Sequence, residues 1–253
     1  MHPSKKLGQN FLIDDNLLNL IIRSSDLQTG DNVIEIGPGT GHLTEQILKQ
    51  DISLTAIEYD VRLSEYLSEK YQQNNFYLIQ ADAGRVNFDE LTADKEWICL
   101  ANLPYAVSTV ILAKIIECKN PPKRMILLLQ KEMADRIASH PGIKNYGALS
   151  VRIQSLYKAE IVRVVPPDVF FPKPDVKSAI LRLDLLNERP EHEIISSLFK
   201  LVKLAFSQRR KRLMKVLKSS YNKDLEEIFN ELNFDRNIRA EQLTVEDFIK
   251  LRK

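Results

Sequence analysis

The sequence predicts an α/β protein: a Rossmann-like domain with a mainly parallel seven-stranded sheet, followed by a small all-helical C-terminal domain. Between residues 31 and 182, short apolar runs alternate with amphipathic stretches, which is typical of βαβ units. A turn with three glycines, Gly37-Pro38-Gly39-Thr40-Gly41, follows the first of these runs. After residue 186 the strand-like runs stop and helical periodicity continues to the end.

Apolar runs of strand length predict the seven strands. They are Asn32–Ile36, Leu54–Glu58, Phe76–Gln80, Trp97–Ala101, Met125–Leu129, Glu160–Val165 and Ser178–Leu183. Between them, helical spacing of apolar residues predicts helices over Leu43–Gln50, Arg62–Tyr71, Thr109–Glu117 and Glu132–Ser139. We expect Ser108 to cap the third of these helices, since a serine side chain can accept from the first free backbone N–H groups.

The polar segment Asn187-Glu188-Arg189-Pro190 predicts a hinge between two domains, residues 1–186 and 187–253. Helical periodicity in the second predicts helices over Ile194–Phe206, Arg210–Leu217, Leu225–Leu232 and Val245–Leu251.

Composition excludes several classes of protein. The chain has 253 residues, 44% of them hydrophobic, which is enough for a sizeable core. Since no apolar run is long enough to span a bilayer or to form a signal core, we expect a cytoplasmic protein without a membrane partner. Cys99 and Cys118 lie in apolar runs, without metal-ligand spacing. The histidines are equally isolated, so no metal site is expected: His2, His42, His140 and His192.

Basic residues concentrate in one part of the chain. The formal net charge is only +2, but residues 194–223 contain nine basic residues and no acidic one. This asymmetry predicts contact with a nucleic-acid backbone. A solvated helix face is the alternative, although such a face usually mixes both signs of charge. The basic residues are Lys200, Lys203, Arg209, Arg210, Lys211, Arg212, Lys215, Lys218 and Lys223.

The glycine-rich turn predicts a nucleoside-containing ligand. Glycines between a strand and a helix let the backbone turn sharply and approach a ligand closely. Glu58 follows Gly37 by about 20 residues, at the end of the next predicted strand, where a carboxylate can accept from ribose hydroxyls.

The form of the turn favours S-adenosylmethionine over a dinucleotide. The spacing is G-x-G-x-G, and His42 stands where a dinucleotide fingerprint has its last glycine. Glu35 beside the turn suits a sulfonium and an amino-acid group better than phosphates. Asp82, at the end of the third predicted strand, is placed to accept from an adenine amino group; the alternative is an ordinary turn or cap residue.

The segment Asn102-Leu103-Pro104-Tyr105 follows a predicted strand, at the sheet edge where such folds carry out their chemistry. The N6 amine of adenine is a poor nucleophile because its lone pair is delocalised into the ring. The side-chain oxygen of Asn102 and the carbonyl of Pro104 would hold both N6 hydrogens and direct the lone pair to a methyl group. An ordinary Asn/Pro turn with a core tyrosine is the alternative.

Aromatic side chains are predicted to hold an extruded base. Tyr105 offers one flat face, and Phe170, in the proline-rich loop Val165–Pro174, offers a second. The alternative for Phe170 is a core aromatic, and Phe171 competes with it for the stacking role.

Taken together, these segments resemble the ribosomal RNA adenine dimethyltransferases, and within them the small-subunit (16S) rRNA enzymes of bacteria. The matching segments cover almost the whole chain. They are Gly8–Leu12, Glu35–Gly41, Asn102–Tyr105, Leu129–Glu132, Tyr146-Gly147 with Leu149-Ser150, Val165–Ser178 and Phe206–Lys211.

The resemblance implies a reaction and its site residues. The reaction is N6,N6-dimethylation of two adjacent adenines near the 3′ end of small-subunit rRNA, within an assembling subunit. An N-terminal segment would cap the cofactor, and Tyr105 and Phe170 would sandwich the adenine. Residues implied to bind S-adenosylmethionine are Asn10, Leu12, Gly37, Glu58, Asp82 and Asn102, and those implied to dock on the subunit are Arg209, Arg210, Lys211 and the adjacent Arg212.

Three other functions are compatible with parts of this pattern. A large-subunit rRNA adenine methylase shares the glycine turn and the acceptor motif, but Gln208–Lys211 and the proline-rich loop favour the small-subunit branch. A non-catalytic ribosome-assembly factor is disfavoured because every assigned site residue is present. A dehydrogenase is disfavoured by the absent last glycine. Ala101 stands where many relatives have glycine, which is a small departure. We expect a monomer, because the substrate is itself very large.

Overall fold

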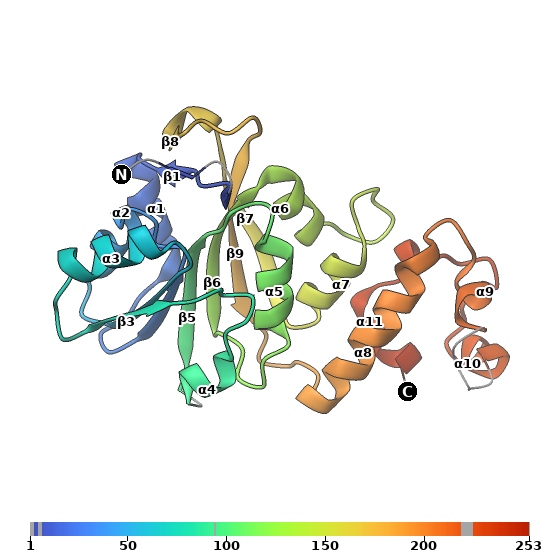
Figure 1. Ribbon diagram of the computed structural model, residues 1–253. Helices are drawn as coiled ribbons and strands as arrows, with labels where there is room; N and C mark the ends of the chain where they lie inside the picture. Colours follow the sequence, from blue (N-terminus) through green and yellow to red (C-terminus); the bar gives the residue numbers. More distant parts are fainter. Residues whose placement is uncertain (1–2, 5–6, 94, 219–224, 253) are drawn as a thin grey trace. The chain divides into compact units, whose positions relative to one another are not determined.

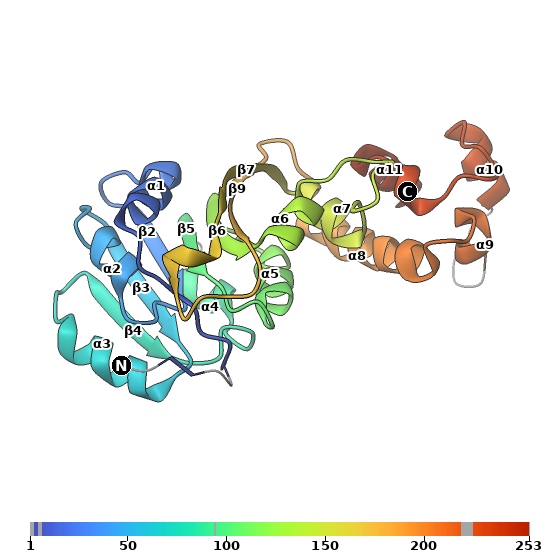
Figure 2. The ribbon, with the colours of Figure 1, turned by 90° about the horizontal axis from the view of Figure 1, so that it is seen from above.

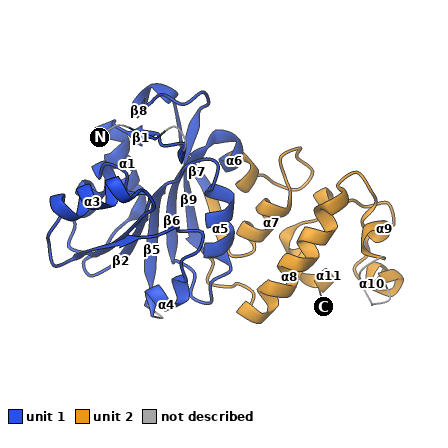
Figure 3. Ribbon diagram, viewed as in Figure 1, with its two compact units in different colours: residues 1–134, 160–185 blue, residues 135–159, 186–253 orange. Residues whose placement is uncertain are grey.

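The structure is a computed structural model that describes residues 3–4, 7–93, 95–218 and 225–252, so His2 and Lys223 lie outside the described residues. The chain forms two compact units (Figure 3). The first contains residues 1–134 and 160–185, and the second contains residues 135–159 and 186–253.

This division differs from the predicted one for residues 135–159, which the sequence analysis assigned to the first domain. These residues make their contacts with the C-terminal helices. The Tyr146 hydroxyl donates to the Leu243 carbonyl at 3.0 Å, and the Arg152 guanidinium lies 4.5 Å from the centre of the Phe199 ring. Such contacts between distant parts of the chain have no local sequence signal.

Within the first unit, the described residues form a seven-stranded sheet around which helices lie on both faces (Figures 1 and 2). Strands β2 to β6 pair in parallel with one another and β9 runs antiparallel to β6, which confirms the predicted mainly parallel sheet. In spatial order the strands are β4 (Phe76–Gln80), β3 (Ser53–Glu58), β2 (Asn32–Ile36), β5 (Trp97–Asn102), β6 (Arg124–Gln130), β9 (Ser178–Leu185) and β7 (Tyr157–Val165).

The strand order reverses between β2 and β5, because the chain proceeds from β2 through β3 to β4 and then returns to place β5 on the other side of β2. In open α/β sheets, ligands bind at the carboxyl ends of the strands beside such a reversal. The glycine turn follows β2, and the Asn-Leu-Pro-Tyr motif begins at the last residue of β5. The topology therefore places these two motifs next to each other.

The helices of the first unit bury apolar faces on the sheet. Leu18 and Ile21 of one helix and Ile47 of another join Val33 and Ile126 of the sheet in a single buried cluster. Removing this apolar surface from water provides the main driving force for folding. The helices are α1 (Asp15–Ser25), α2 (His42–Ile47), α3 (Val61–Lys70), α4 (Phe88–Thr92), α5 (Ser108–Ile116) and α6 (Lys131–Ile137), the last of which crosses the unit boundary.

Some local predictions need correction. Helix α1 was not predicted, although the Asp14 side chain caps it by accepting from Leu17 N–H. Helix α4 and, in the second unit, the helix over Ala148–Gln154 were not predicted either. Ser108 does not cap α5: Val107 occupies the cap position, and Ser108 is the first helical residue. Its buried hydroxyl donates to the Tyr105 carbonyl at 3.0 Å instead.

A two-stranded ribbon fastens the N-terminal segment. Strand β1 (Phe11–Leu12) pairs antiparallel with β8 (Phe170–Phe171), so that Leu12 lies opposite Phe170 and Phe11 opposite Phe171. Directly opposed residues point to the same side of an antiparallel pair. Leu12 and Phe170 are both buried in the core, whereas Phe171 is 56% exposed.

The second unit is helical, as predicted. It contains α7 (Ala148–Gln154), α8 (His192–Ala205), α9 (Leu213–Leu217), α10 (Leu225–Glu231) and α11 (Val245–Arg252). The predicted helix from Arg210 instead begins at Leu213, because the 3₁₀ turn η3 (Phe206–Gln208) and a bend precede it. Phe206 lies 5.8 Å from Phe248 between ring centres.

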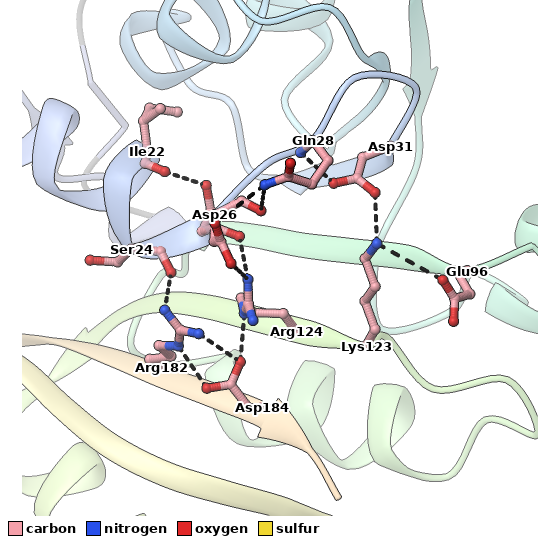
Figure 4. A network of polar contacts seen from close by, with 11 residues as sticks. Ile22, Ser24, Asp26, Gln28, Asp31, Glu96, Lys123, Arg124, Arg182 and Asp184 are labelled. Atoms are coloured by element: carbon pink, nitrogen blue, oxygen red, sulfur yellow. Dashed lines mark hydrogen bonds and ion pairs between the residues drawn. The ribbon is translucent and has the colours of Figure 1, made fainter. Parts of the chain in front are cut away.

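Two arginines fasten the end of α1 to the sheet (Figure 4). Arg182 of β9 donates to the Ser24 carbonyl at 2.9 Å, and Arg124 of β6 donates to the Ser25 carbonyl at 3.0 Å. Carbonyls in the last turn of a helix lack partners within the helix, so these bonds satisfy them. Asp184 accepts from both guanidinium groups. Burial raises the pKa of Asp184, but the hydrogen bonds from Arg182 and Arg124 outweigh it and hold the pKa below its ordinary value.

We expect Asp184→Asn to lower the free energy of unfolding of the first unit by about 1–3 kcal/mol at pH 7, since hydrogen bonds to a charged group are lost. A carboxyl whose pKa is lower in the folded state stabilises the fold above its unfolded pKa of about 3.9, and this contribution disappears as the pH falls below that value. Urea unfolding, followed by the fluorescence of the single tryptophan, Trp97, should show the difference at pH 7 and a smaller one at pH 3.

The exposed Asp51 offers a matched control. Asp51→Asn should leave the midpoint unchanged. An Asp184→Asn protein as stable as the parent at pH 7 would show that the network adds nothing to folding.

Candidate active site

A cavity of about 510 Å³ lies at the carboxyl ends of the central strands, entirely within the first unit. This volume is in the range of pockets that bind small molecules and cofactors. The N-terminal segment contributes residues 7–11, the glycine turn contributes Gly37 and Gly39, and the loops after β3, β4 and β5 contribute the remaining walls up to the start of α5.

Most of the predicted site residues meet in this cavity. Its lining includes Asn10, Gly37, Glu58, Asp82, Asn102, Pro104 and Tyr105. Leu12 and Phe170 do not line it; both side chains are buried in the apolar core, 5% and 4% exposed.

The glycine turn is shaped by residues that press against it. Gly39 has a φ of +60°, and a Cβ there would lie 2.9 Å from the ring of Phe11. Gly41 has a φ of +84°, and the Tyr71 hydroxyl donates to its carbonyl at 2.9 Å. A side chain at either position would need a strained backbone and would collide with an aromatic ring. Gly39 therefore lets the N-terminal segment lie directly on the turn, and Gly41 lets Tyr71 do the same from the end of α3.

Glu58 connects the glycine turn to the end of β3. Its carboxylate accepts from Gly39 N–H at 3.1 Å and from Asp60 N–H at 2.8 Å, and the residue is 5% exposed. Burial raises the pKa of Glu58, while these backbone hydrogen bonds oppose the rise. Glu58 also lines the cavity, and its carboxylate oxygens can accept further hydrogen bonds from hydroxyl groups such as those of a ribose.

Glu35 has a different role from the predicted one. It is 1% exposed, accepts from the Thr44 hydroxyl at 2.6 Å, and lies outside the lining of the large cavity. Burial raises the pKa of Glu35 to about 8. The side chain is therefore mostly protonated at neutral pH, so the argument that its charge favours a sulfonium does not hold here. It instead ties β2 to the first turn of α2.

Asp82 follows β4 and lines the cavity. One carboxylate oxygen accepts from Gly84 N–H at 2.9 Å, and the other lies 3.5 Å from Arg85. The turn interpretation and the ligand interpretation are thus compatible: the turn fixes a carboxylate that still faces the cavity.

Asn102 is held in one orientation. Its side-chain amide nitrogen donates to the Asn10 carbonyl at 3.0 Å. Among the described residues, none donates to the side-chain oxygen, which is left as the acceptor at the cavity. The N-terminal segment therefore determines which end of the amide a ligand meets.

Pro104 requires a correction. Its carbonyl accepts from Val107 N–H at 3.1 Å and from Ser108 N–H at 3.2 Å, because it begins the hydrogen bonding of α5. A carbonyl with two backbone donors is a poor second acceptor for an amine. The preceding residue, Leu103, also lines the cavity, and within the described chain no hydrogen bond reaches its carbonyl.

Tyr105 lines the cavity with its ring partly buried. Its hydroxyl lies 2.6 Å from the hydroxyl of Ser178, the first residue of β9. Burial raises the pKa of Tyr105, so the phenol is neutral under physiological conditions. The ring offers a fixed, uncharged face to a ligand in the cavity.

Three cavity residues were not predicted. Phe11 lies on the glycine turn, and Gln9 donates to Asp60 at 3.1 Å, which fastens the N-terminal segment beside Glu58. Tyr59 is 58% exposed and follows Glu58 directly. An aromatic residue exposed at a strand end could have been recognised from its place in the sequence, whereas Gln9 and Phe11 depend on how the N-terminus folds back.

Those predicted basic residues that the structure describes lie in the second unit and are exposed. The Arg209 guanidinium already has partners within the second unit: it donates to the Glu241 carboxylate at 2.9 Å and to the Lys144 carbonyl at 2.6 Å. Arg210, Lys211 and Arg212 occupy the bend before α9, with their side chains in solvent.

The described ranges contain neither a candidate metal site nor a candidate membrane span. No group of three or more His, Cys, Asp or Glu side chains is placed to hold a metal ion. No described helix has the length and apolar character needed to cross a membrane.

The cavity fits S-adenosylmethionine in volume and in chemistry. Glu58 and Asp82 supply acceptors for hydroxyl and amino donors, Tyr59 supplies an aromatic surface, and Gly37 lets the backbone approach closely. Most of the remaining lining residues are apolar, as adenine-binding surfaces require.

Solved structures show the same fold. A dimethyladenosine transferase from Plasmodium falciparum superposes with a TM-score of 0.81 at 24% identity, covering 95% of each chain. The 23S rRNA methyltransferase ErmE gives a TM-score of 0.74 at 23% identity, covering 96% of this chain and 98% of its own.

Sequence comparison is more specific. The protein named "Ribosomal RNA small subunit methyltransferase A" from Clostridium botulinum (strain Okra / Type B1) is 41% identical over 254 residues, which cover 98% of this chain and 92% of its own length. A protein of the same name from Bacillus cytotoxicus is 40% identical over 98% of this chain and 89% of its own length. The model of the ribosomal RNA adenine dimethylase family matches residues 2–253. With the cofactor cavity and the Asn-Leu-Pro-Tyr motif at one sheet edge, the chain belongs to the ribosomal RNA adenine dimethylase family of S-adenosylmethionine-dependent methyltransferases.

Proposed function

We propose that this enzyme transfers methyl groups from S-adenosylmethionine to N6 of two adjacent adenines near the 3′ end of 16S rRNA, in the assembling small subunit in the cytoplasm. The observation that carries the proposal is the Asn102 amide, held by the Asn10 carbonyl so that its oxygen is free at a cavity shared with Tyr105. The small-subunit target is supported by the name of relatives about 40% identical over almost the whole chain. We propose that the enzyme acts as a monomer.

Several residues would hold the cofactor. Glu58 would accept from the ribose hydroxyls, Asp82 from the adenine amino group, and Gly37 and Asn10 would border the end that carries the methyl group. When bound, S-adenosylmethionine supplies an electrophilic methyl group on a sulfonium, whose departure leaves a neutral thioether and needs no metal.

The acceptors for the adenine amine are the Asn102 side-chain oxygen and the Leu103 carbonyl, in place of the Pro104 carbonyl. Each would accept one N6 hydrogen. Held in this way, the nitrogen turns its lone pair out of conjugation and towards the methyl group. The N6–C bond forms as the C–S bond breaks, and the methylated amine then releases one proton to water. Alignment of this kind supplies rate without a strong base.

Tyr105 would stack on the extruded adenine. A base removed from its helix loses stacking with its neighbours, and an aromatic side chain replaces part of that energy. Phe170 is buried and does not offer the second face.

Transfer of radiolabelled methyl from S-adenosylmethionine to unmethylated small subunits tests the proposal. Large-subunit precursors and DNA serve as competing substrates, and the products are digested and identified as nucleosides. We expect N6,N6-dimethyladenine in small-subunit rRNA alone. Label confined to large-subunit rRNA would replace the proposal with the large-subunit alternative, and no label on any substrate would favour a non-catalytic assembly factor.

The basic bend should matter for docking rather than chemistry. We expect the triple change Arg210→Ala, Lys211→Ala and Arg212→Ala to weaken binding to small subunits and to lower the slope of log affinity against log salt by about two, since each phosphate contact contributes about 0.7–0.9. Affinity for S-adenosylmethionine, measured by calorimetry, should not change.

Exposed lysines of the first unit provide the control: Lys49, Lys95 and Lys119, each changed to alanine, remove the same charge elsewhere. If both triple variants change the salt slope equally, the bend has no specific docking role. Arg209 is left intact because its contacts with Glu241 and Lys144 lie within the second unit's own structure.

A further inference from the structure

The hydroxyl of Ser178 contacts the phenolic hydroxyl of Tyr105 in the candidate active site. The two hydroxyl oxygens, of Ser178 and Tyr105, lie 2.6 Å apart. Ser178 belongs to the proline-rich segment Val165–Ser178, whose sequence matches the family but whose last residue has no role in the mechanism above. Tyr105 comes from the loop after β5, so this contact joins residues 73 positions apart.

Burial and strand pairing hold Ser178 in place. It is fully buried, at 0% exposed, and as the first residue of β9 it pairs with Gln130, the last residue of β6. The following residues Ala179 and Ile180 are also fully buried. The adjacent Lys177 carbonyl accepts from Lys131 N–H at 2.9 Å. The serine hydroxyl therefore has little freedom to move.

Tyr105 is held at both ends. Ser108 donates to its backbone carbonyl, and Ser178 meets its phenolic hydroxyl. The first contact fixes where the side chain starts, but it leaves the two side-chain torsions free. The second contact fixes the position of the phenolic oxygen, and with it the direction of the ring's long axis in the cavity.

We propose that Ser178 is a positioning residue for methyl transfer: its hydroxyl fixes the long axis of the Tyr105 ring, and so the place of the ring in the cavity, so that a base stacked on it presents its amine to Asn102. This inference rests on the proposed function, because it requires Tyr105 to carry the adenine. A displacement of reacting groups by about 1 Å can lower a rate by about a hundredfold. The role should therefore appear in kcat and leave the cofactor site unchanged.

The test uses Ser178→Ala, Tyr105→Phe and the double variant in the small-subunit assay. Tyr105→Phe removes the hydrogen bond without altering β9, so it reports on the bond even if Ser178→Ala disturbs packing. We expect each single change to lower kcat about tenfold to a hundredfold, with the KM and Kd for S-adenosylmethionine unchanged. Because both changes remove one bond, the double variant should be no slower than the slower single variant.

Ser25 provides the matched control. It is also a fully buried serine of the first unit, and its hydroxyl donates to the Ile22 carbonyl at 2.6 Å. It lies at the other end of β6, beside Arg124. Ser25→Ala should keep the parental kcat, and Trp97 fluorescence should show that all variants are folded.

Tyr105→Ala distinguishes a failure of the positioning role of Ser178 from a failure of the proposed function. If Tyr105→Ala is inactive while Ser178→Ala and Tyr105→Phe keep the parental kcat, the positioning role is overturned and the proposed function stands. The positioning role would also be overturned if the fold-decreases in kcat of Ser178→Ala and Tyr105→Phe multiplied in the double variant. If Tyr105→Ala itself keeps full activity, the stacking role assigned to Tyr105 in the proposed function is overturned, and the inference fails with it.

Discussion

Asn102→Ala is expected to lower kcat for methyl transfer by about a thousandfold or more, while the protein stays folded. Removing one preorganised hydrogen-bonding group from an active site typically costs about 10²–10³ in rate. Here the side chain also sets the direction of the nucleophile's lone pair, which no other described residue at the cavity replaces. The measurement is single-turnover transfer to unmethylated small subunits at saturating cofactor.

Asn75→Ala provides the control for Asn102→Ala. Its side-chain amide also donates to a backbone carbonyl, that of Ile52, at 3.0 Å, but on the opposite edge of the sheet. This variant should transfer methyl groups at the parental rate. Full activity of Asn102→Ala would remove Asn102 from the acceptor role, and unfolding of both variants would show that such amide bonds serve stability.

Asn102→Asp examines the amide itself. An aspartate keeps an acceptor oxygen but cannot donate to the Asn10 carbonyl, which it would repel. We expect a loss intermediate between the parental enzyme and Asn102→Ala, because the oxygen is present but no longer held in place. This result would separate the acceptor atom from the contact that orients it.

Glu58→Ala is expected to raise the Kd for S-adenosylmethionine by at least about a hundredfold. The change removes the acceptor proposed for the ribose and leaves two backbone donors, on Gly39 and Asp60, without their carboxylate. Each hydrogen bond to a charged group is worth about 1.5–3 kcal/mol, and a tenfold change in affinity corresponds to about 1.4 kcal/mol. Calorimetric titration with S-adenosylmethionine and with its demethylated product gives the two Kd values.

Glu58→Gln and Glu96→Gln complete this experiment. Glutamine keeps one acceptor oxygen, so Glu58→Gln should raise Kd about tenfold. Glu96 is a highly exposed glutamate of the first unit, and Glu96→Gln should have no effect on affinity. An unchanged Kd in Glu58→Ala would refute the assignment of Glu58 to the cofactor.

Local sequence patterns were sufficient to predict the seven strands of the main sheet and most of the described helices. The seven strands lie within a few residues of their predicted bounds, because runs such as Met125–Leu129 must be buried on both faces of a parallel sheet. The glycine turn and the Asn-Leu-Pro-Tyr motif could also be predicted, because each motif consists of consecutive residues. Helix α1 was missed even though it has an Asp14 cap and an apolar face.

The errors concern residues whose role depends on distant neighbours. Phe170 and Phe171 are adjacent and identical in type, and only the pairing of β8 with β1 decides which of them enters the core. The Pro104 carbonyl is an exception, because its two donors, Val107 and Ser108, are close in the sequence and occupy it where helix α5 begins. Glu35 is buried by elements on all sides, and its pKa follows from that burial.

By itself, the sequence determined the fold class, the cofactor turn and the acceptor motif, since periodicity, glycine conformation and motif spacing are properties of short segments. Tertiary structure alone decided how the site is held. Asn102 is oriented by a carbonyl 92 residues away, and Tyr105 is fixed by a hydroxyl 73 residues away. A hydrogen bond depends on distance and direction in space, and the order of residues along the chain specifies neither until the sheet has brought them together.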